Sequence, residues 1–164
     1  MNNFDNTWIS YVEDLKDPRH ENTILTEIKN AEKIVFVAKG RVGLATNMFM
    51  QRLSQLGYKV SHSEDLLVPH LSKRDLVIFV TASGSTESSL TYTKIAKRLG
   101  VKTMAITFNA GGPICENCDI VVEYPQPKNQ KHLMKSYYEI GFIYILERII
   151  SLLPAEEFVH TNFE

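Results

Sequence analysis

A dense group of hydroxyl side chains follows an apolar run in the middle of the chain. The run DLVIFV, residues 75–80, has the composition of a buried strand, and the loop TASGST, residues 81–86, comes directly after it. Hydroxyls donate hydrogen bonds to anionic oxygens, and a glycine lets backbone N–H groups approach a ligand closely. A helical pattern begins at Glu87, so a helix N-terminus would lie beside the loop. We therefore expect a phosphate site formed by Thr81, Ser83, Gly84, Ser85 and Thr86.

An ordinary helix start is the alternative interpretation of this loop. Serine and threonine are favoured N-cap residues, and Glu87 suits a first helical turn because acidic groups are stabilised there. A single cap accounts for one hydroxyl, whereas the loop contains four. The excess of hydroxyls favours an anion-binding site.

A second glycine loop, KGRVG at residues 39–43, follows the apolar run KIVFVA. It lacks the third glycine of a dinucleotide fingerprint, and the chain contains no G-x-x-x-x-G-K-[ST] stretch, so the sequence disfavours NAD and ATP as ligands. The chain also lacks the G-x-S-x-G turn of the serine hydrolases. Because these motifs are absent, the expected anion site is the main indication of function in the sequence.

The cysteine pair Cys115 and Cys118 has a spacing used in zinc sites and redox loops. A zinc site needs about four ligands, and the sequence offers no second cysteine pair. A redox pair normally opens a helix after a strand, whereas this pair precedes the run DIVVEY. The histidines at positions 20, 62, 70 and 132 show no metal-ligand spacing either. We expect buried small cysteines and no metal site.

The composition predicts one globular domain over residues 1–164. A chain of 164 residues with 44% hydrophobic content can bury a single core. The formal net charge is −1 with acids and bases interspersed, so there is no broad basic field to attract nucleic acid or an anionic membrane. The start MNNFDNTWIS has no basic segment followed by a long apolar run, which predicts a cytoplasmic protein.

Strands and helices alternate along the chain with short links. The runs KIVFVA, YKVSHS, DLVIFV, KTMAIT and DIVVEY have strand composition, and helical spacing covers 24–33, 44–56, 87–99 and 132–153, with Gly100 as a helix stop. Such alternation implies right-handed crossovers and a parallel sheet covered on both faces. We predict a five-stranded parallel sheet in a three-layer αβα sandwich. Ligands of such sheets bind at the carboxyl ends of the strands, where both glycine loops lie.

The same segments resemble the sugar isomerase (SIS) domain family, and within it the 6-phospho-3-hexuloisomerases. AKGRVG at 38–43, followed by QRL at 51–53, is similar to the family's G-x-G-R-S-G and M-R-L. TASGST is similar to S-G-S-G-E-T, and MKSYYE at 134–139 to Met-Gly-[ST]-Leu-Phe-Glu. The end VHTNFE at 159–164 is similar to R-H-A-N-L-E. The glutamate helix and this tail indicate the hexuloisomerase branch.

The resemblance implies interconversion of D-arabino-3-hexulose 6-phosphate and fructose 6-phosphate through an enediol. It implies Glu139 as the base, His160 as the residue that moves the hydroxyl proton, and Arg41 as the group that stabilises the enediolate, with Gly40 also binding substrate. It further implies an enzyme without metal or nucleotide cofactor that forms a homo-oligomer, often a tetramer. The apolar segment IGFIYILERIISLL, within the expected helix 132–153, predicts that this helix lies at a subunit interface.

The chain departs from the family pattern at several positions. Val42 replaces a serine, Ala38 a glycine, Ser85 a glutamate, Lys135 a glycine and Val159 an arginine, while Lys39 adds a charge. Two alternatives therefore stay open beside the hexulose isomerase: a sensor that binds a phosphosugar without converting it, and an isomerase of another sugar phosphate such as arabinose 5-phosphate. A sensor would usually carry a helix-turn-helix module, and the roughly 30 residues before the first strand are too few for one.

Overall fold

A single five-stranded sheet forms the centre of the protein. The computed structural model describes residues 3–66, 69–126 and 136–154. All neighbouring strands are parallel, in the order β2–β1–β3–β4–β5. The strands are β1 (Ile34–Val37), β2 (Val60–His62), β3 (Leu76–Thr81), β4 (Lys102–Thr107) and β5 (Ile120–Glu123). The predicted five-stranded parallel sheet is confirmed.

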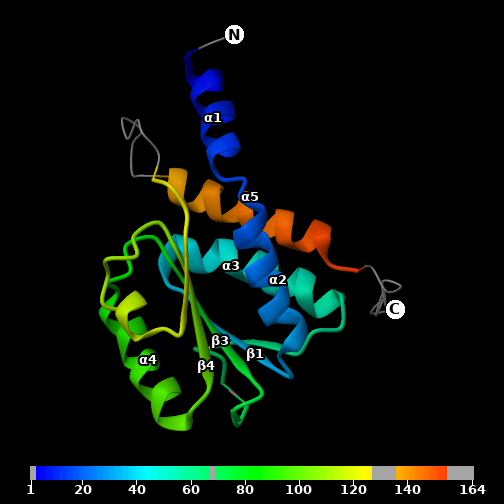
Figure 1. The fold of residues 1–164 in the computed structure, drawn as a ribbon, viewed down its shortest axis with the longest axis vertical. Helices are drawn as coiled ribbons and strands as arrows, with labels where there is room; N and C mark the ends of the chain where they lie inside the picture. The colour runs from blue at the N-terminus through cyan, green and yellow to red at the C-terminus, as the bar shows by residue number, and fades with distance from the viewer. Residues whose placement is uncertain (1–2, 67–68, 127–135, 155–164) are drawn as a thin grey trace.

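Helices cover both faces of the sheet (Figure 1). The helices of the described residues are α1 (Asn3–Asp14), α2 (Pro18–Asn30), α3 (Gly40–Gln55), α4 (Glu87–Leu99), α5 (Tyr137–Leu152) and the short 3₁₀ helix η1 (Cys115–Asn117). The helices α2, α3 and α5 lie on one side of the sheet and α4 lies on the other. This arrangement confirms the predicted αβα layers.

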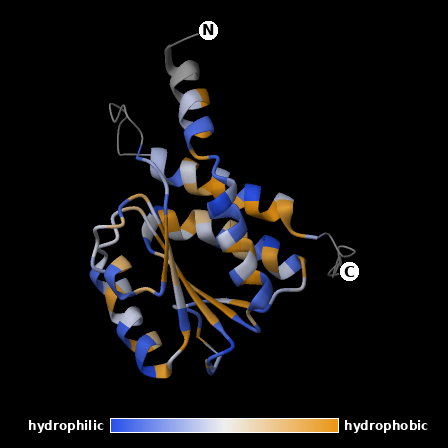
Figure 2. Cartoon of the chain, in the orientation of Figure 1, coloured by the Kyte–Doolittle hydropathy of each residue, from blue (hydrophilic) through white to orange (hydrophobic). Residues whose placement is uncertain are grey.

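The strand side chains supply the two cores between these layers. Residues that follow one another in a strand point to opposite faces. Ile34 and Phe36 accordingly pack into the core under α2, α3 and α5, while Val35 and Val37 pack into the core under α4. The central strands β1 and β3 are buried along their whole length, as expected for strands covered on both faces. Figure 2 shows the hydrophobic residues concentrated in the strands and on the inner sides of the helices.

The helix ends follow local capping chemistry. The Asp17 side chain accepts a hydrogen bond from the Arg19 backbone N–H at 2.9 Å, and Pro18 occupies the first position of α2. The helix α4 ends before Gly100, whose φ of 64° is readily adopted by glycine. The bounds predicted for α4 and β4 agree with the structure, whereas α3 begins at Gly40 rather than at residue 44.

The helix α1 was not predicted from the sequence, and it extends beyond the layers in Figure 1. Asparagine and aspartate are poor residues for a helix interior, and they make this segment look irregular. Its apolar residues nevertheless recur at helical spacing, and Tyr11 is buried, as is Leu15 just after the helix. Trp8 packs on Tyr137 of α5 with a ring-centroid distance of 4.6 Å. Packing against α5 therefore accompanies the helical conformation of α1, which its composition alone did not predict.

The apolar helix α5 is buried largely by the chain itself. Phe142, Ile145 and Ile149 lie in the core formed with α2 and α3, and Ile140 and Leu152 are the exposed large apolar residues of this helix. The surface that predicted a subunit interface is thus covered in large part within one chain, and assembly through this helix stays a prediction. Residues 132–135 of the predicted helix lie outside the described residues. No helix in the described part of the chain is long and apolar enough to cross a membrane.

Candidate active site

A pocket of about 400 Å³ opens at the carboxyl edge of the sheet. It lies where the strand order reverses, between β1 and β3, which is the usual ligand position in open parallel sheets. Segments that follow four different strands reach it, together with the first turn of α5. The residues around the pocket are Lys39, Arg41, Val42, Ala82, Ser83, Asn109, Gln126, Tyr138 and Glu139.

The hydroxyl loop between β3 and α4 is held by its own side chains. The Gly84 backbone N–H donates to Thr81 Oγ1 at 3.1 Å, and Thr81 is buried. Ser83 Oγ accepts from the Ser85 N–H at 3.3 Å and from Ser85 Oγ at 3.0 Å. Thr81 therefore shapes the turn, while the exposed serines present hydroxyls near the pocket.

The segment after β4 braces this loop from behind. The Ile114 N–H donates to the Gly84 carbonyl at 2.9 Å, and Asn109 Nδ2 donates to the Ser83 carbonyl at 3.0 Å. A Cβ on Gly84 would lie 2.8 Å from the Asn109 carbonyl oxygen, and the φ of Gly84 is +67°. A Cβ on Gly112 would lie 2.5 Å from the Gly84 carbonyl oxygen. Both positions therefore require glycine, and the loop conformation depends on that close contact.

The start of α4 does not use the ordinary hydroxyl cap. Thr86 occupies the N-cap position, and its side chain makes no capping hydrogen bond. The capping alternative raised by the sequence is therefore not realised at this residue. A helix N-terminus without a side-chain cap keeps N–H groups that can bind an anion.

Arg41 and Glu139 meet across the mouth of the pocket. Arg41 lies in the first turn of α3 and Glu139 in the first turn of α5, and Arg41 Nε lies 3.0 Å from Glu139 Oε1. The Glu139 side chain is only 16% exposed, and its Oε2 is a buried atom without a hydrogen-bond partner in the part of the chain that the structure describes. One carboxylate oxygen is thus oriented by a guanidinium, and the other is available to accept a proton.

Lys39 adds a second cation to the pocket. It is the N-cap residue of α3, and its ammonium is hydrogen-bonded to the Glu64 carboxylate. That bond lowers the pKa of Glu64, which is therefore ionised at neutral pH. The pocket thus combines the Glu139 carboxylate with two cations. Such a set can remove a proton next to a carbonyl and stabilise the negative charge that develops on the oxygen.

The structure brings together some of the predicted site residues. Arg41, Ser83 and Glu139 surround the pocket. Other predicted residues support the same loops without lining it: Gly40, Thr81, Gly84, Ser85 and Thr86. His160 lies outside the described residues. The sequence interpretation missed Asn109 and Gln126; their position directly after β4 and shortly after β5, at the same sheet edge, could have revealed them.

The two cysteines are free thiols in the structure. Burial raises the pKa of Cys115, and burial raises the pKa of Cys118 to about 12, so both thiols are protonated at neutral pH. Among the described residues, no group of three or more His, Cys, Asp or Glu side chains could hold a metal ion.

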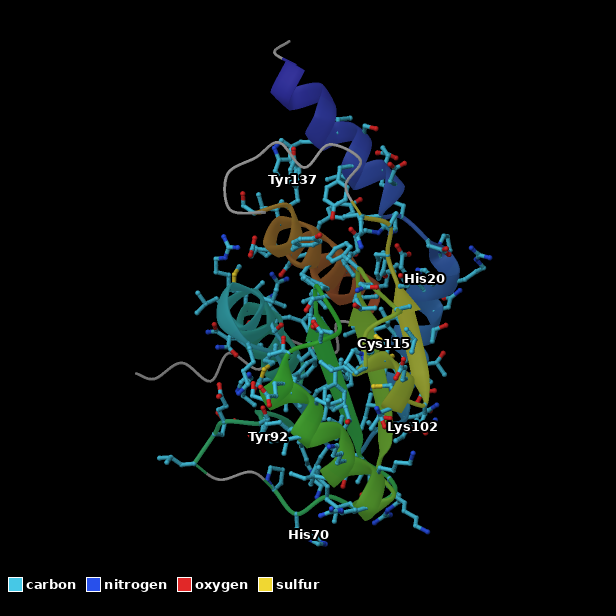
Figure 3. All side chains as sticks on the ribbon, turned by 90° about the vertical axis from the view of Figure 1, so that its left-hand side faces the viewer. His20, His70, Tyr92, Lys102, Cys115 and Tyr137 are labelled. Atoms are coloured by element: carbon cyan, nitrogen blue, oxygen red, sulfur yellow. The ribbon has the colours of Figure 1, made fainter. Side chains whose placement is uncertain are left out.

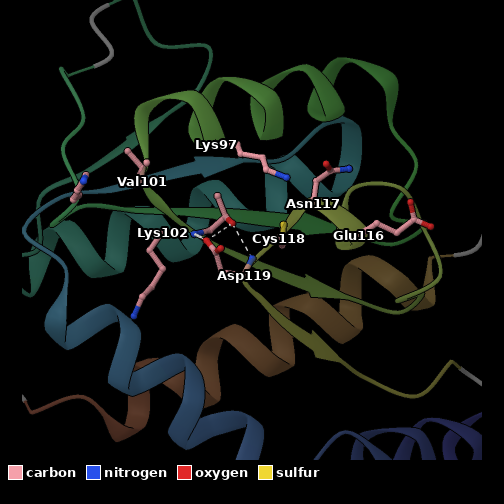
Figure 4. Close-up of a pocket in the computed structure, with 10 residues that line it drawn as sticks. Lys97, Val101, Lys102, Glu116, Asn117, Cys118 and Asp119 are labelled. Carbon is pink, nitrogen blue, oxygen red and sulfur yellow. Dashed lines mark hydrogen bonds between the residues drawn. The ribbon is translucent and has the colours of Figure 1, made fainter.

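A larger pocket of about 560 Å³ lies at the amino ends of β4 and β5 (Figure 4). Polar groups in it already have partners: Asp119 Oδ2 accepts from the Thr103 N–H at 2.8 Å and from Thr103 Oγ1 at 2.7 Å. Lys102 pairs with Glu27 at 2.8 Å. Parallel sheets bind ligands at the opposite edge, so the smaller pocket is the better candidate.

Comparison with known proteins gives relatives of similar length. A protein named 3-hexulose-6-phosphate isomerase from Methylomonas aminofaciens is 30% identical, over 88% of this chain and 88% of its own. One of the same name from Mycobacterium gastri is 28% identical, over 90% of this chain and 76% of its own. A solved hypothetical protein from Methanococcus jannaschii, for which a molecular function of 3-hexulose-6-phosphate isomerase was inferred, is 27% identical with a TM-score of 0.79, over 87% of this chain and 84% of that chain.

The family model for the SIS domain matches residues 27–146, which include both glycine loops and the start of α5. The relatives support a phosphosugar isomerase, and their similarity extends over most of the chain. With the sheet, the hydroxyl loop and the matched residues in agreement, the chain belongs to the SIS domain family.

Proposed function

We propose that this protein interconverts D-arabino-3-hexulose 6-phosphate and fructose 6-phosphate. The reaction moves a carbonyl between C3 and C2 of the sugar. A base removes the proton from C2 of the hexulose, an enediol forms, and the proton returns to C3, while a hydroxyl proton moves from O2 to O3. The two relatives described above carry the name of this reaction, which supports the choice among sugar phosphates.

The observation that carries the proposal is the state of Glu139. Its Oε1 is fixed by Arg41 at 3.0 Å, and its buried Oε2 has no hydrogen-bond partner within the described residues. A carboxylate that a guanidinium holds at the wall of a pocket is placed to exchange a proton with a bound sugar, which favours a catalytic role over a purely structural one. In the proposed reaction Glu139 carries the proton between the two carbons.

Arg41 has two roles in this proposal. Its guanidinium orients the carboxylate of Glu139. It also lines the pocket, so it can donate to the sugar oxygen on which negative charge develops. His160, from the resemblance, would move the hydroxyl proton between O2 and O3.

The phosphate would bind at the hydroxyl loop and the start of α4. Ser83 lines the pocket, and the uncapped N-terminus of α4 follows two residues after Ser85. The proposal requires no metal or nucleotide, and it includes assembly of a homo-oligomer. The tetramer, the cytoplasmic location and the extent of one domain over 1–164 stay predictions.

Proton exchange with solvent tests the reaction and its alternatives together. The purified protein is incubated with fructose 6-phosphate in D₂O, and the sugar protons are followed by NMR. Loss of the C3 proton signal with retention of the C1 protons is the expected result, because only transfer between C2 and C3 exchanges that position. Loss at C1 would indicate an aldose–ketose isomerase. Exchange at C2 of arabinose 5-phosphate instead would identify the pentose phosphate alternative. Binding of fructose 6-phosphate without exchange would identify a sensor.

A further inference from the structure

The side chain of Lys39 brings a positive charge to the candidate active site. Lys39 is the residue just before α3, and it lines the candidate active site. Its ammonium is bonded to the Glu64 carboxylate and lies 5.7 Å from the ring centroid of Tyr92. Tyr92 lies on α4, as Figure 3 shows. The side chain therefore reaches from the start of α3 toward the helix that follows the hydroxyl loop.

Positive charge accumulates at the start of α3. A helix N-terminus carries a partial positive charge and favours anions. The first turn of α3 nevertheless contains no acidic residue and carries Arg41, two residues after the N-cap Lys39. The carboxylates that balance this charge come from outside α3, with Glu64 on Lys39 and Glu139 on Arg41. Such a concentration of cations in a pocket suits an anionic ligand.

The two balancing carboxylates differ in how firmly they are held. Glu139 is largely buried, whereas the Glu64 side chain is 58% exposed. An ion pair with an exposed partner contributes little to stability, so Lys39 can exchange this partner at low cost. The ammonium itself has a second support, because Tyr92 is anchored by its hydroxyl, which donates to the Ser63 carbonyl at 3.0 Å. Loss of Glu64 would therefore leave Lys39 in the pocket.

We propose that the phosphate of the ligand displaces Glu64 from Lys39, and that Lys39 selects phosphorylated sugars over neutral ones. The identity of the sugar in this inference rests on the proposed function, whereas the binding of its phosphate by Lys39 does not. A phosphate monoester carries nearly two negative charges near pH 7 and three acceptor oxygens, so it outcompetes a single exposed carboxylate for the ammonium. Glu64 then acts as an internal competitor that neutralises Lys39 when the pocket holds no ligand.

Isothermal titration calorimetry with inorganic phosphate and with fructose 6-phosphate tests this exchange. Lys39→Met should weaken binding of both by roughly 10- to 100-fold, because a charge-assisted contact is lost. Glu64→Gln should tighten both by up to about fivefold, because the competing exposed ion pair is removed. The double variant should bind as weakly as Lys39→Met alone. The matched control is Lys102→Met, since Lys102 also pairs with one glutamate but is the first residue of β4, at the opposite edge of the sheet.

The outcomes separate this inference from the proposed reaction. Tighter binding by Glu64→Gln supports the exchange, and a misfolded variant cannot produce it. Unchanged phosphate binding in Lys39→Met, weaker binding in Glu64→Gln, or absence of phosphate binding to the wild-type protein would overturn the exchange. A wild-type protein that binds phosphate with these variant effects but exchanges no sugar proton would refute the isomerase and leave the role of Lys39 intact.

Discussion

Replacing Glu139 by glutamine separates the chemical role of this residue from its structural role. Glutamine keeps the size of the side chain and an oxygen that can accept from Arg41 Nε, now 3.0 Å from Glu139 Oε1. The ion pair is lost, but Arg41 is 49% exposed, so the free energy of unfolding should fall by less than about 1 kcal/mol. An amide nitrogen takes the place of the buried Oε2, and it cannot accept a proton from carbon.

The effect on the reaction should be much larger. Removal of a positioned general base typically lowers the rate by roughly 10²- to 10⁴-fold, or about 2.7–5.5 kcal/mol of transition-state stabilisation. We therefore expect Glu139→Gln to lower kcat by that factor and to change KM far less. The measurement combines solvent deuterium exchange by NMR with a urea titration of the same sample.

The chain provides a matched control in Glu147→Gln. Arg52 and Glu147 also link α3 to α5, with Nη1 and Oε2 at 3.0 Å, but about 12 Å further along α5 from Glu139. This variant should lose similar stability and keep full activity. Equal activity in Glu139→Gln and Glu147→Gln would show that Glu139 only ties the two helices together, and the base would have to be sought elsewhere.

Four further predictions concern the hydroxyl loop, the ion pair of a buried glutamate and a buried thiol. Ser83→Ala should weaken phosphate binding by about 1–3 kcal/mol in calorimetry, and unchanged affinity would exclude its hydroxyl as a ligand group. Gly84→Ala should destabilise the fold by about 1–3 kcal/mol in urea, because the new Cβ would lie 2.8 Å from a backbone oxygen at a φ of +67°; wild-type stability would refute the close contact. Arg148→Met should cost about 2–3 kcal/mol in urea, because it leaves the buried Glu21 carboxylate without the 2.6 Å contact, and a neutral effect would contradict this. Burial raises the pKa of Cys118 to about 12, so this thiol ionises at lower pH in the unfolded chain than in the native protein. The free energy of unfolding should therefore fall as pH rises from about 8.5 toward that value. Iodoacetamide should label the native protein slowly at pH 8, and rapid labelling would show an accessible thiolate.

Several features of the fold could be predicted from local patterns alone. The runs KIVFVA, DLVIFV and KTMAIT are rich in β-branched residues and bounded by turn residues, so their strand character is a local property. Gly100 ends α4 because its left-handed φ is readily adopted by glycine. The alternation of strands and helices then limits the topology to a parallel sheet with helices on both faces. The helix α1 was missed because its polar residues hide an apolar face that is defined by contact with α5.

The sequence predicted only those residues of the candidate site that their residue type or the family resemblance marks. The hydroxyl loop, Arg41 and Glu139 stood out by residue type or by resemblance to a family, and all three reach one sheet edge. Asn109 and Gln126 belong to no motif, so only their positions after the predicted strands β4 and β5 could have indicated them.

Tertiary structure also decided which charges meet. Arg41 could pair with many acids in the sequence, and packing of α3 against α5 selects Glu139. The sequence by itself determined the strands, the helices other than α1, the position of the hydroxyl loop and the family, because these depend on residues close together in the chain. Only the tertiary structure decided the partners of Lys39 and Arg41 and the buried oxygen of Glu139, because charge pairing and desolvation depend on distances between segments far apart in the sequence.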